Sequence, residues 1–148
     1  MSSEIPNPIA TPRWEHFSHG ADIGVRGIGP TKEEAFRQAA ISLTAVITDP
    51  AGIVPERSVV VEREAPDDDI LLLDWLNALI YEMSANRLIF GRFEVDIQGR
   101  HLHGRAWGEA IDIGRHEPVV EVKGATCTAL SVRQNEGGEW IAQCVVDV

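Results

Sequence analysis

The sequence of residues 31–50, TKEEAFRQAAISLTAVITDP, carries a full set of signals for one amphipathic helix. Thr31 and Glu34 have the spacing of a capping box, in which the threonine hydroxyl accepts a hydrogen bond from a backbone N–H three residues on. Apolar residues then recur at helical spacing and form one face, at Phe36, Ala39, Ala40, Leu43, Val46 and Ile47. Pro50 ends the helix, because the residue before a proline is pushed out of the helical region.

A second helix is predicted after Pro66, where three aspartates stand in a row at 67–69. Negative charge at a helix start complements the macrodipole, and capping explains this cluster better than a metal site does. The apolar face of this helix comprises Leu71, Leu72, Trp75, Leu76, Leu79, Ile80 and Met83. Asp74, Asn77 and Glu82 are predicted to face outward.

The rest of the chain has the pattern of strands and turns. Strands are predicted at 14–17, 21–28, 58–64, 93–97, 101–108, 119–123, 125–133 and 140–148, the last two joined by a hairpin turn at 135–138. Glycines within residues 20–29 indicate a bulge or a close approach of another backbone. Two amphipathic helices and segregated strands predict an α+β fold, with both helices packed on one face of a largely antiparallel or mixed β-sheet.

Length and composition predict one soluble domain. The chain has 148 residues, of which 44% are hydrophobic and 24% charged, as in ordinary globular proteins. Residues 1–13 contain three prolines and no periodicity, so we expect a flexible tail there and a single domain over 14–148. No apolar run is long enough to span a bilayer, and the N-terminus lacks the features of a secretory signal. A cytoplasmic location is therefore expected.

The charge balance restricts the partners. Thirteen basic against 23 acidic residues give a net charge of −10, so the surface repels phosphate backbones. Strong direct binding of nucleic acid is not expected, because its affinity comes mainly from neutralised phosphates. A basic protein partner or a metal cation suits this surface better, although acidic surfaces also occur without either. The oligomeric state is not determined by the sequence.

No catalytic motif is present. The chain lacks a nucleophile elbow and a phosphate-binding P-loop, which predicts a protein that is not an enzyme on its own. Cys127 and Cys144 are interpreted as small apolar packing residues. Two histidine pairs, 16/19 and 101/103, have side chains that can ligate zinc, but no further ligand follows at a familiar spacing. Exposed strand histidines that form hydrogen bonds are the favoured interpretation.

Two carboxylates interrupt apolar strands. Asp22 lies in the glycine-rich strand predicted at 21–28, and Asp147 lies between Val146 and Val148 near the end of the sequence. A carboxylate in such a setting must be paired, cap a backbone group or bind a cation, because an unpaired buried charge is costly. Asp147 and the α-carboxylate of Val148 offer hard oxygen ligands, and one further aspartate would make a Ca²⁺- or Mg²⁺-type site. A merely solvated terminal aspartate is the alternative.

Several sequence blocks, in order, resemble the archease family. They are WEHFSHGADIGVRG at 14–27, TKEEAF at 31–36, LLLDWLN at 71–77, GE at 108–109, HEP at 116–118, EVKGAT at 121–126 and WIAQCVVDV at 140–148. Each block is short, but together they cover the chain from residue 14 to the end.

The resemblance implies a fold, a partner and a site. Archeases are small α+β proteins that activate the GTP-dependent tRNA-splicing RNA ligase, promoting its guanylylation and multiple turnover without joining RNA themselves. The family's divalent-cation site corresponds to Asp22, Asp147 and Val148. The expected ion is Ca²⁺, with Mg²⁺ and Mn²⁺ as the alternatives. The family's functional lysine corresponds to Lys123, which would act in ligase activation together with the two aspartates. A chaperone or assembly factor for RNA-modifying enzymes is the alternative function.

The sequence departs from the family pattern at four positions. Gly20 replaces a usual threonine, Gly124 a usual alanine, and Cys127-Thr128 a usual tyrosine-histidine pair. If that pair contacts the ligase in the family, this chain is expected to be weaker or suited to a divergent partner. Because the aspartates and the lysine are intact, the activity itself is expected to be retained.

Overall fold

The computed structural model describes residues 11–148 of the protein, so most of the tail predicted at 1–13 lies outside the described residues. In chain order the elements are β1 (Arg13–His19), β2 (Asp22–Gly29), α1 (Lys32–Ile47), η1 (Pro50–Gly52), β3 (Arg57–Glu64), α2 (Asp68–Asn86), β4 (Leu88–Gln98), β5 (His101–Ala110), α3 (Ile113–His116), β6 (Gly124–Ala125), β7 (Ser131–Gln134) and β8 (Trp140–Asp147). Arg13, predicted to belong to the tail, is already part of the first strand.

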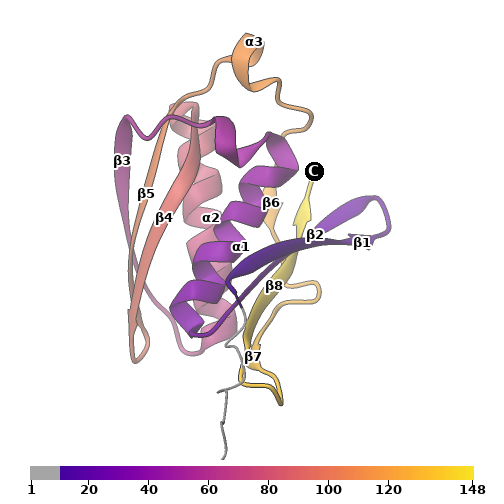
Figure 1. Cartoon of the computed structure of the whole chain (residues 1–148), viewed down its shortest axis with the longest axis vertical. Helices are drawn as coiled ribbons and strands as arrows, with labels where there is room; N and C mark the ends of the chain where they lie inside the picture. The colour runs from indigo at the N-terminus through magenta and orange to yellow at the C-terminus, as the bar shows by residue number, and fades with distance from the viewer. Residues whose placement is uncertain (1–10) are drawn as a thin grey trace, which may run out of the picture.

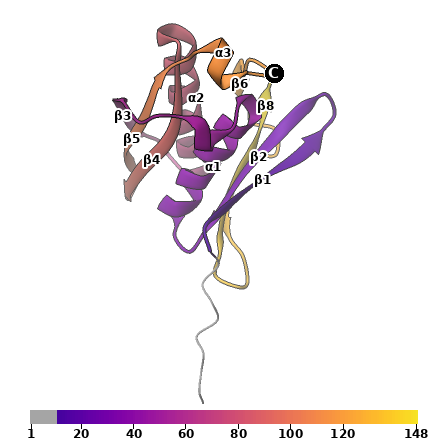
Figure 2. The ribbon, with the colours of Figure 1, turned by 45° about the horizontal axis from the view of Figure 1, so that its top comes forward.

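The strands form two antiparallel sheets with the two long helices between them. One sheet has the order β1-β2-β8-β6, with β7 also paired to β8, and the other has the order β3-β5-β4. Figures 1 and 2 show α1 and α2 in the layer between these sheets. The α+β class and the antiparallel pairing are confirmed. The strands are nevertheless divided between two sheets, because the valine-rich β3 pairs with β5 and not with the strands before α1.

The predicted caps and apolar faces of both helices are confirmed. Thr31 Oγ1 accepts from the Glu34 N–H at 3.1 Å, and Asp67 Oδ1 accepts from the Ile70 N–H at 2.9 Å. All predicted face residues are buried except Met83, which is half-buried. The three aspartates have separate roles: Asp67 caps α2, Asp68 pairs with Lys32 at 3.0 Å, and Asp69 accepts from the Val132 N–H at 2.8 Å. This arrangement supports capping over a metal cluster.

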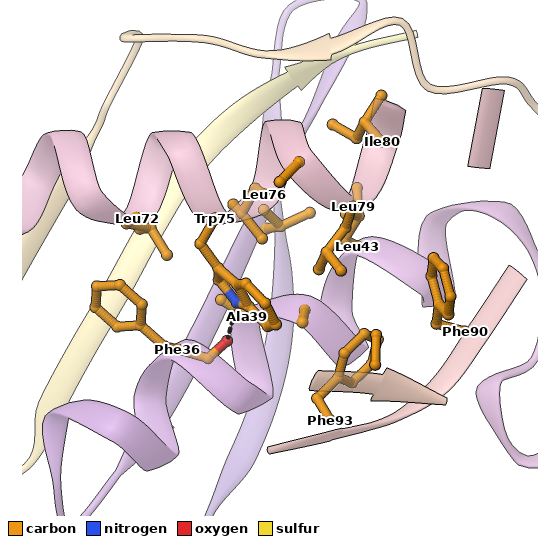
Figure 3. Close-up of a cluster of buried hydrophobic side chains, with 14 of the residues drawn as sticks. Phe36, Ala39, Leu43, Leu72, Trp75, Leu76, Leu79, Ile80, Phe90 and Phe93 are labelled. Atoms are coloured by element: carbon orange, nitrogen blue, oxygen red, sulfur yellow. Dashed lines mark hydrogen bonds between the residues drawn. The ribbon is translucent and has the colours of Figure 1, made fainter. Parts of the chain in front are cut away.

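Trp75 occupies the centre of the core, as Figure 3 shows. Its indole N–H donates to the Phe36 carbonyl at 3.2 Å, and its ring meets Phe93 edge to face at a centroid distance of 6.2 Å. A Cβ on Gly104 would lie only 2.5 Å from the indole ring, so the glycine makes room for the tryptophan. Helix α2 thereby packs directly on the sheet β3-β5-β4.

One predicted strand is wrong, and another is confirmed only in part. Residues 119–123 have no regular structure, and the Val119 N–H donates to the Ile47 carbonyl at the end of α1 instead of to a strand. The strand predicted at 125–133 is broken by a turn at Cys127, leaving the two-residue β6 and the four-residue β7. The hairpin turn between β7 and β8 is confirmed. None of the helices within residues 11–148 is long and apolar enough to cross a bilayer.

Candidate functional site at the end of strands β2 and β8

The predicted site residues meet where β2 begins and β8 ends. The last register pair between these strands is Ile23 with Val146, so Asp22 and Asp147 are the next positions along. Asp22 is half-buried, and its Oδ1 accepts from the Val148 N–H at 3.4 Å. Asp147 is exposed. We call Asp22, Asp147 and Val148 the carboxylate tip.

Lys123 lies beside the carboxylate tip on the other edge of β8. Its backbone N–H donates to the Asp147 carbonyl at 2.8 Å, and its side chain is exposed. The chain has two lysines, and the other, Lys32, is held by Asp68 and lies over the Trp140 ring. Within residues 11–148 the exposed Lys123 ammonium makes no hydrogen bond or ion pair.

A tight hairpin places Asp22 at the tip. His19 pairs with Asp22 across β1 and β2, which leaves Gly20 and Ala21 as the turn. Gly20 has a φ of +58°, a left-handed conformation that glycine adopts without strain. The departure from the family threonine at this position therefore suits the turn.

The donor chemistry of the carboxylate tip suits a hard cation. The side chains of Asp22 and Asp147 offer carboxylate oxygen atoms, which Ca²⁺, Mg²⁺ and Mn²⁺ prefer over nitrogen or sulfur. In the part of the chain that the structure describes, no three His, Cys, Asp or Glu side chains are grouped closely enough to hold a metal. Asp22 and Asp147 therefore do not make a three-ligand set with another of these side chains in the described residues.

The departures on the segment after Lys123 are tolerated by the fold. A Cβ on Gly124 would lie 3.8 Å from Asn77 Oδ1, an ordinary contact, so the usual alanine would also fit. Cys127 and Thr128 are exposed in a turn, which corrects the prediction that Cys127 packs as a small apolar residue. Cys144 is buried as predicted, and burial raises the pKa of its thiol to about 12, so it is not a nucleophile.

Asn77 was predicted to face solvent and does not. Its side-chain Nδ2 donates to the Ala125 carbonyl at 3.3 Å, and its Oδ1 accepts from the Ala125 N–H at 2.9 Å. The sequence signal is ambiguous, because a polar residue on a helix between apolar neighbours is usually solvated. Its place in the block LLLDWLN was the only indication of a special role.

A buried ionic network holds the segment that leads to Lys123. Glu109 is buried and accepts from the Val54 N–H at 2.7 Å, from Arg115 and from His116 Nε2 at 3.1 Å. The Asp112 N–H donates to His116 Nδ1 at 2.8 Å, which fixes the proton of a neutral His116 on Nε2. The bonds from the Val54 N–H, His116 and Arg115 lower the pKa of Glu109 to about 2, against the opposing effect of burial. Sequence reasoning had singled out Glu109 and His116 only through the family blocks.

This depressed pKa makes a prediction for acid stability. The Glu109 carboxylate stabilises the native state fully above its ordinary pKa of 4.5, and the stabilisation is lost as the pH falls toward about 2. We therefore expect Glu109→Gln to be less stable than the parent at neutral pH, with the difference shrinking below pH 4.5. Urea unfolding over a pH series measures it. A Glu109→Gln difference independent of pH would contradict the assignment.

One histidine of each pair forms the hydrogen bond favoured from the sequence. His16 Nε2 lies 2.8 Å from the Ser42 carbonyl oxygen, and His103 Nδ1 lies 2.8 Å from Glu62 Oε1. Neither pair gains a third ligand within the described chain.

An apolar hollow lies beside the segment 111–122. It has a volume of about 440 Å³ and is lined mainly by aliphatic side chains, among them Ile47, Met83, Leu88, Ile111, Pro118 and Val122. Two aliphatic side chains on this segment are strongly exposed, Ile113 at 67% and Val119 at 76%. Both α3 and the C-terminus lie at the same end of the molecule in Figure 2.

Two long helices between two antiparallel sheets, with the carboxylate tip and Lys123 at one end, define the chain as a small α+β protein. The Archease protein family model matches residues 14–148. The protein archease of Pyrococcus furiosus is 39% identical over 140 residues, covering 92% of this chain and 99% of the relative. The chain belongs to the archease family.

Two solved structures agree with this assignment. A solution structure of Methanobacterium thermoautotrophicum protein 1598 is similar with a TM-score of 0.80 and 30% identity, covering 91% of this chain and 98% of the other. A crystal structure from Thermotoga maritima, described as an archease and possible chaperone, shares the fold with a TM-score of 0.60 and 18% identity, covering 90% of this chain and 96% of the other. The suspected family resemblance is confirmed.

Proposed function

We propose that this protein is a non-enzymatic activator of a GTP-dependent tRNA-splicing RNA ligase, acting in the cytoplasm through the carboxylate tip and Lys123. The observation that carries the proposal is the convergence of Asp22, Asp147, Val148 and Lys123 at one end of the fold, linked by the Val148–Asp22 and Lys123–Asp147 hydrogen bonds. The family supplies the expected partner.

The charges support docking of this end into a basic cleft. The net charge of −10 complements the surface of a protein that binds RNA, and such complementarity raises the association rate and selects the partner. A Ca²⁺, Mg²⁺ or Mn²⁺ ion on the carboxylate tip would neutralise part of the local negative charge. Lys123 would then meet a nucleotide phosphate or a ligase carboxylate through a charge-assisted hydrogen bond.

The test is a multiple-turnover ligation assay with purified ligase, RNA ends, GTP and a divalent cation, scored also for ligase guanylylation. We expect Asp147→Asn and Lys123→Ala each to lower stimulation of the ligase by about tenfold or more. A tenfold loss corresponds to only about 1.4 kcal/mol of interaction free energy with the ligase. The matched control is Asp96→Asn, which removes an exposed carboxylate from β4 in the other sheet. Calorimetric titration with Ca²⁺ should show weaker binding for Asp22→Asn and Asp147→Asn than for Asp96→Asn.

A second candidate, a chaperone or assembly factor for RNA-modifying enzymes, is favoured by the apolar hollow and the exposed Ile113 and Val119. Under this function the protein would suppress aggregation of unrelated clients, and Asp147→Asn would suppress it equally well while Val119→Asp would not. Unchanged ligase stimulation in both Asp147→Asn and Lys123→Ala would contradict the activator proposal and favour this one.

A further inference from the structure

The side chain of Asn77 bonds to the backbone of Ala125 as a neighbouring strand would. It accepts from the Ala125 N–H at 2.9 Å and donates to the Ala125 carbonyl at 3.3 Å, so both polar backbone groups of one residue are satisfied by one side chain. Asn77 is half-buried on α2, between the buried Leu76 and Ala78. A rigid core helix therefore fixes the position of Ala125.

The segment that Asn77 holds on one side is bonded to β8 on the other, where the Lys123 N–H donates to the Asp147 carbonyl at 2.8 Å and the Thr126 N–H and hydroxyl both donate to the Val145 carbonyl. Strand β6 is two residues long and pairs with β8 only at Gly124 with Asp147 and at Ala125 with Val146. Residues 117–123, which precede it, have no regular structure, and a turn follows at Cys127. Lys123 lies between the buried Val122 and the Ala125 that Asn77 fixes. The place of the Lys123 backbone thus depends on Val122, on the bond to Asp147 and on Asn77.

We propose that Asn77 is a positioning residue that sets the place of Lys123 relative to the carboxylate tip, and so links core helix α2 to the acting end of the protein. The role of Lys123 in this proposal rests on the proposed function. The position of Lys123 rests on the hydrogen bonds alone. Without the amide, the Ala125 N–H and carbonyl would turn to water, and β6 would keep its bonds to β8 but lose its connection to α2.

The two lysines of the chain permit a direct test that needs no ligase. Reductive methylation with ¹³C-formaldehyde keeps the lysine charge and gives two lysine NMR signals, which Lys123→Arg assigns. We expect Asn77→Ala to shift the Lys123 signal and to leave the Lys32 signal unchanged. The matched control is Asn86→Ala on the same helix, because Asn86 is exposed and bonds only to Glu82.

A second experiment measures the maximal stimulation of the ligase by each variant. Asn77→Ala is expected to lower it by about tenfold, equivalent to about 1.4 kcal/mol, while Asn86→Ala leaves it unchanged. Asn77→Asp keeps the acceptor for the Ala125 N–H but loses the donor, so its stimulation of the ligase should lie between those of Asn77→Ala and Asn86→Ala. This variant guards against the case in which Asn77→Ala merely fails to fold.

The outcomes separate this inference from the proposed function. A Lys123 signal that does not move in folded Asn77→Ala would overturn the positioning role, as would shifts of both lysine signals that reflect general loosening. A moved Lys123 signal together with a parent protein that fails to stimulate the ligase would support the positioning role and overturn the proposed function.

Discussion

Trp75→Ala is expected to lower the free energy of unfolding by about 3–5 kcal/mol, a large share of the about 5–15 kcal/mol that holds a typical domain folded. The side chain is fully buried, so its removal leaves a cavity between α2, α1 and the sheet β3-β5-β4. It also leaves the Phe36 carbonyl without its indole donor and removes the edge-to-face contact with Phe93. Urea unfolding followed by circular dichroism measures the change.

Gly104 gives this prediction an internal control. A Cβ at position 104 would lie 2.5 Å from the Trp75 ring, so Gly104→Ala should destabilise the parent by about 1–3 kcal/mol through overpacking. In a Trp75→Ala background the methyl group added by Gly104→Ala enters the space that the indole left. Gly104→Ala should therefore lower the free energy of unfolding by less than it does in the parent. Strictly additive effects of the two substitutions would show that the indole does not pack against Gly104.

Local signals determined how much of this fold could be predicted. The caps at Thr31 and Asp67 and the apolar faces of both helices depend on residues a few positions apart, and they were predicted correctly. The division into two sheets depends on pairings between distant strands, such as β2 with β8, which periodicity does not contain. The segment 119–123 alternates like a strand, yet its backbone bonds to the end of α1 at Val119 and to β8 at Lys123 without forming a strand ladder, which the local pattern does not show.

The candidate site shows the same limit. Asp22 and Asp147 were found because a charge within an apolar strand is conspicuous, and the structure places them at adjoining positions. Asn77 was missed because its partner is a backbone 48 residues away, which no local pattern indicates. Glu109 and His116 were likewise visible only as parts of family blocks, since their bond forms through the turn of α3.

Gly27→Ala is expected to destabilise the protein by more than about 3 kcal/mol, at or beyond the upper end of the range for overpacked cores. A Cβ on Gly27 would lie 2.0 Å from the Ala35 carbonyl oxygen and 2.2 Å from the Ala39 nitrogen. Both atoms belong to the backbone of α1, which cannot rotate aside as a side chain can. The helix would have to lift off β2, which would open the core around the fully buried Val25, Ala35 and Ala39.

The matched control is Gly52→Ala, because a Cβ at that exposed position meets nothing within 4 Å, and the change should stay within about 0.5 kcal/mol. Equal unfolding free energies for the two variants would contradict the close approach of α1 and β2. Under the proposed function the contact also bears on cation binding, because β2 begins at Asp22, pairs with β1 and β8 along its two edges, and packs against α1. Any folded fraction of Gly27→Ala should therefore bind Ca²⁺ more weakly than Gly52→Ala, since a shifted β2 separates Asp22 from Asp147 and Val148.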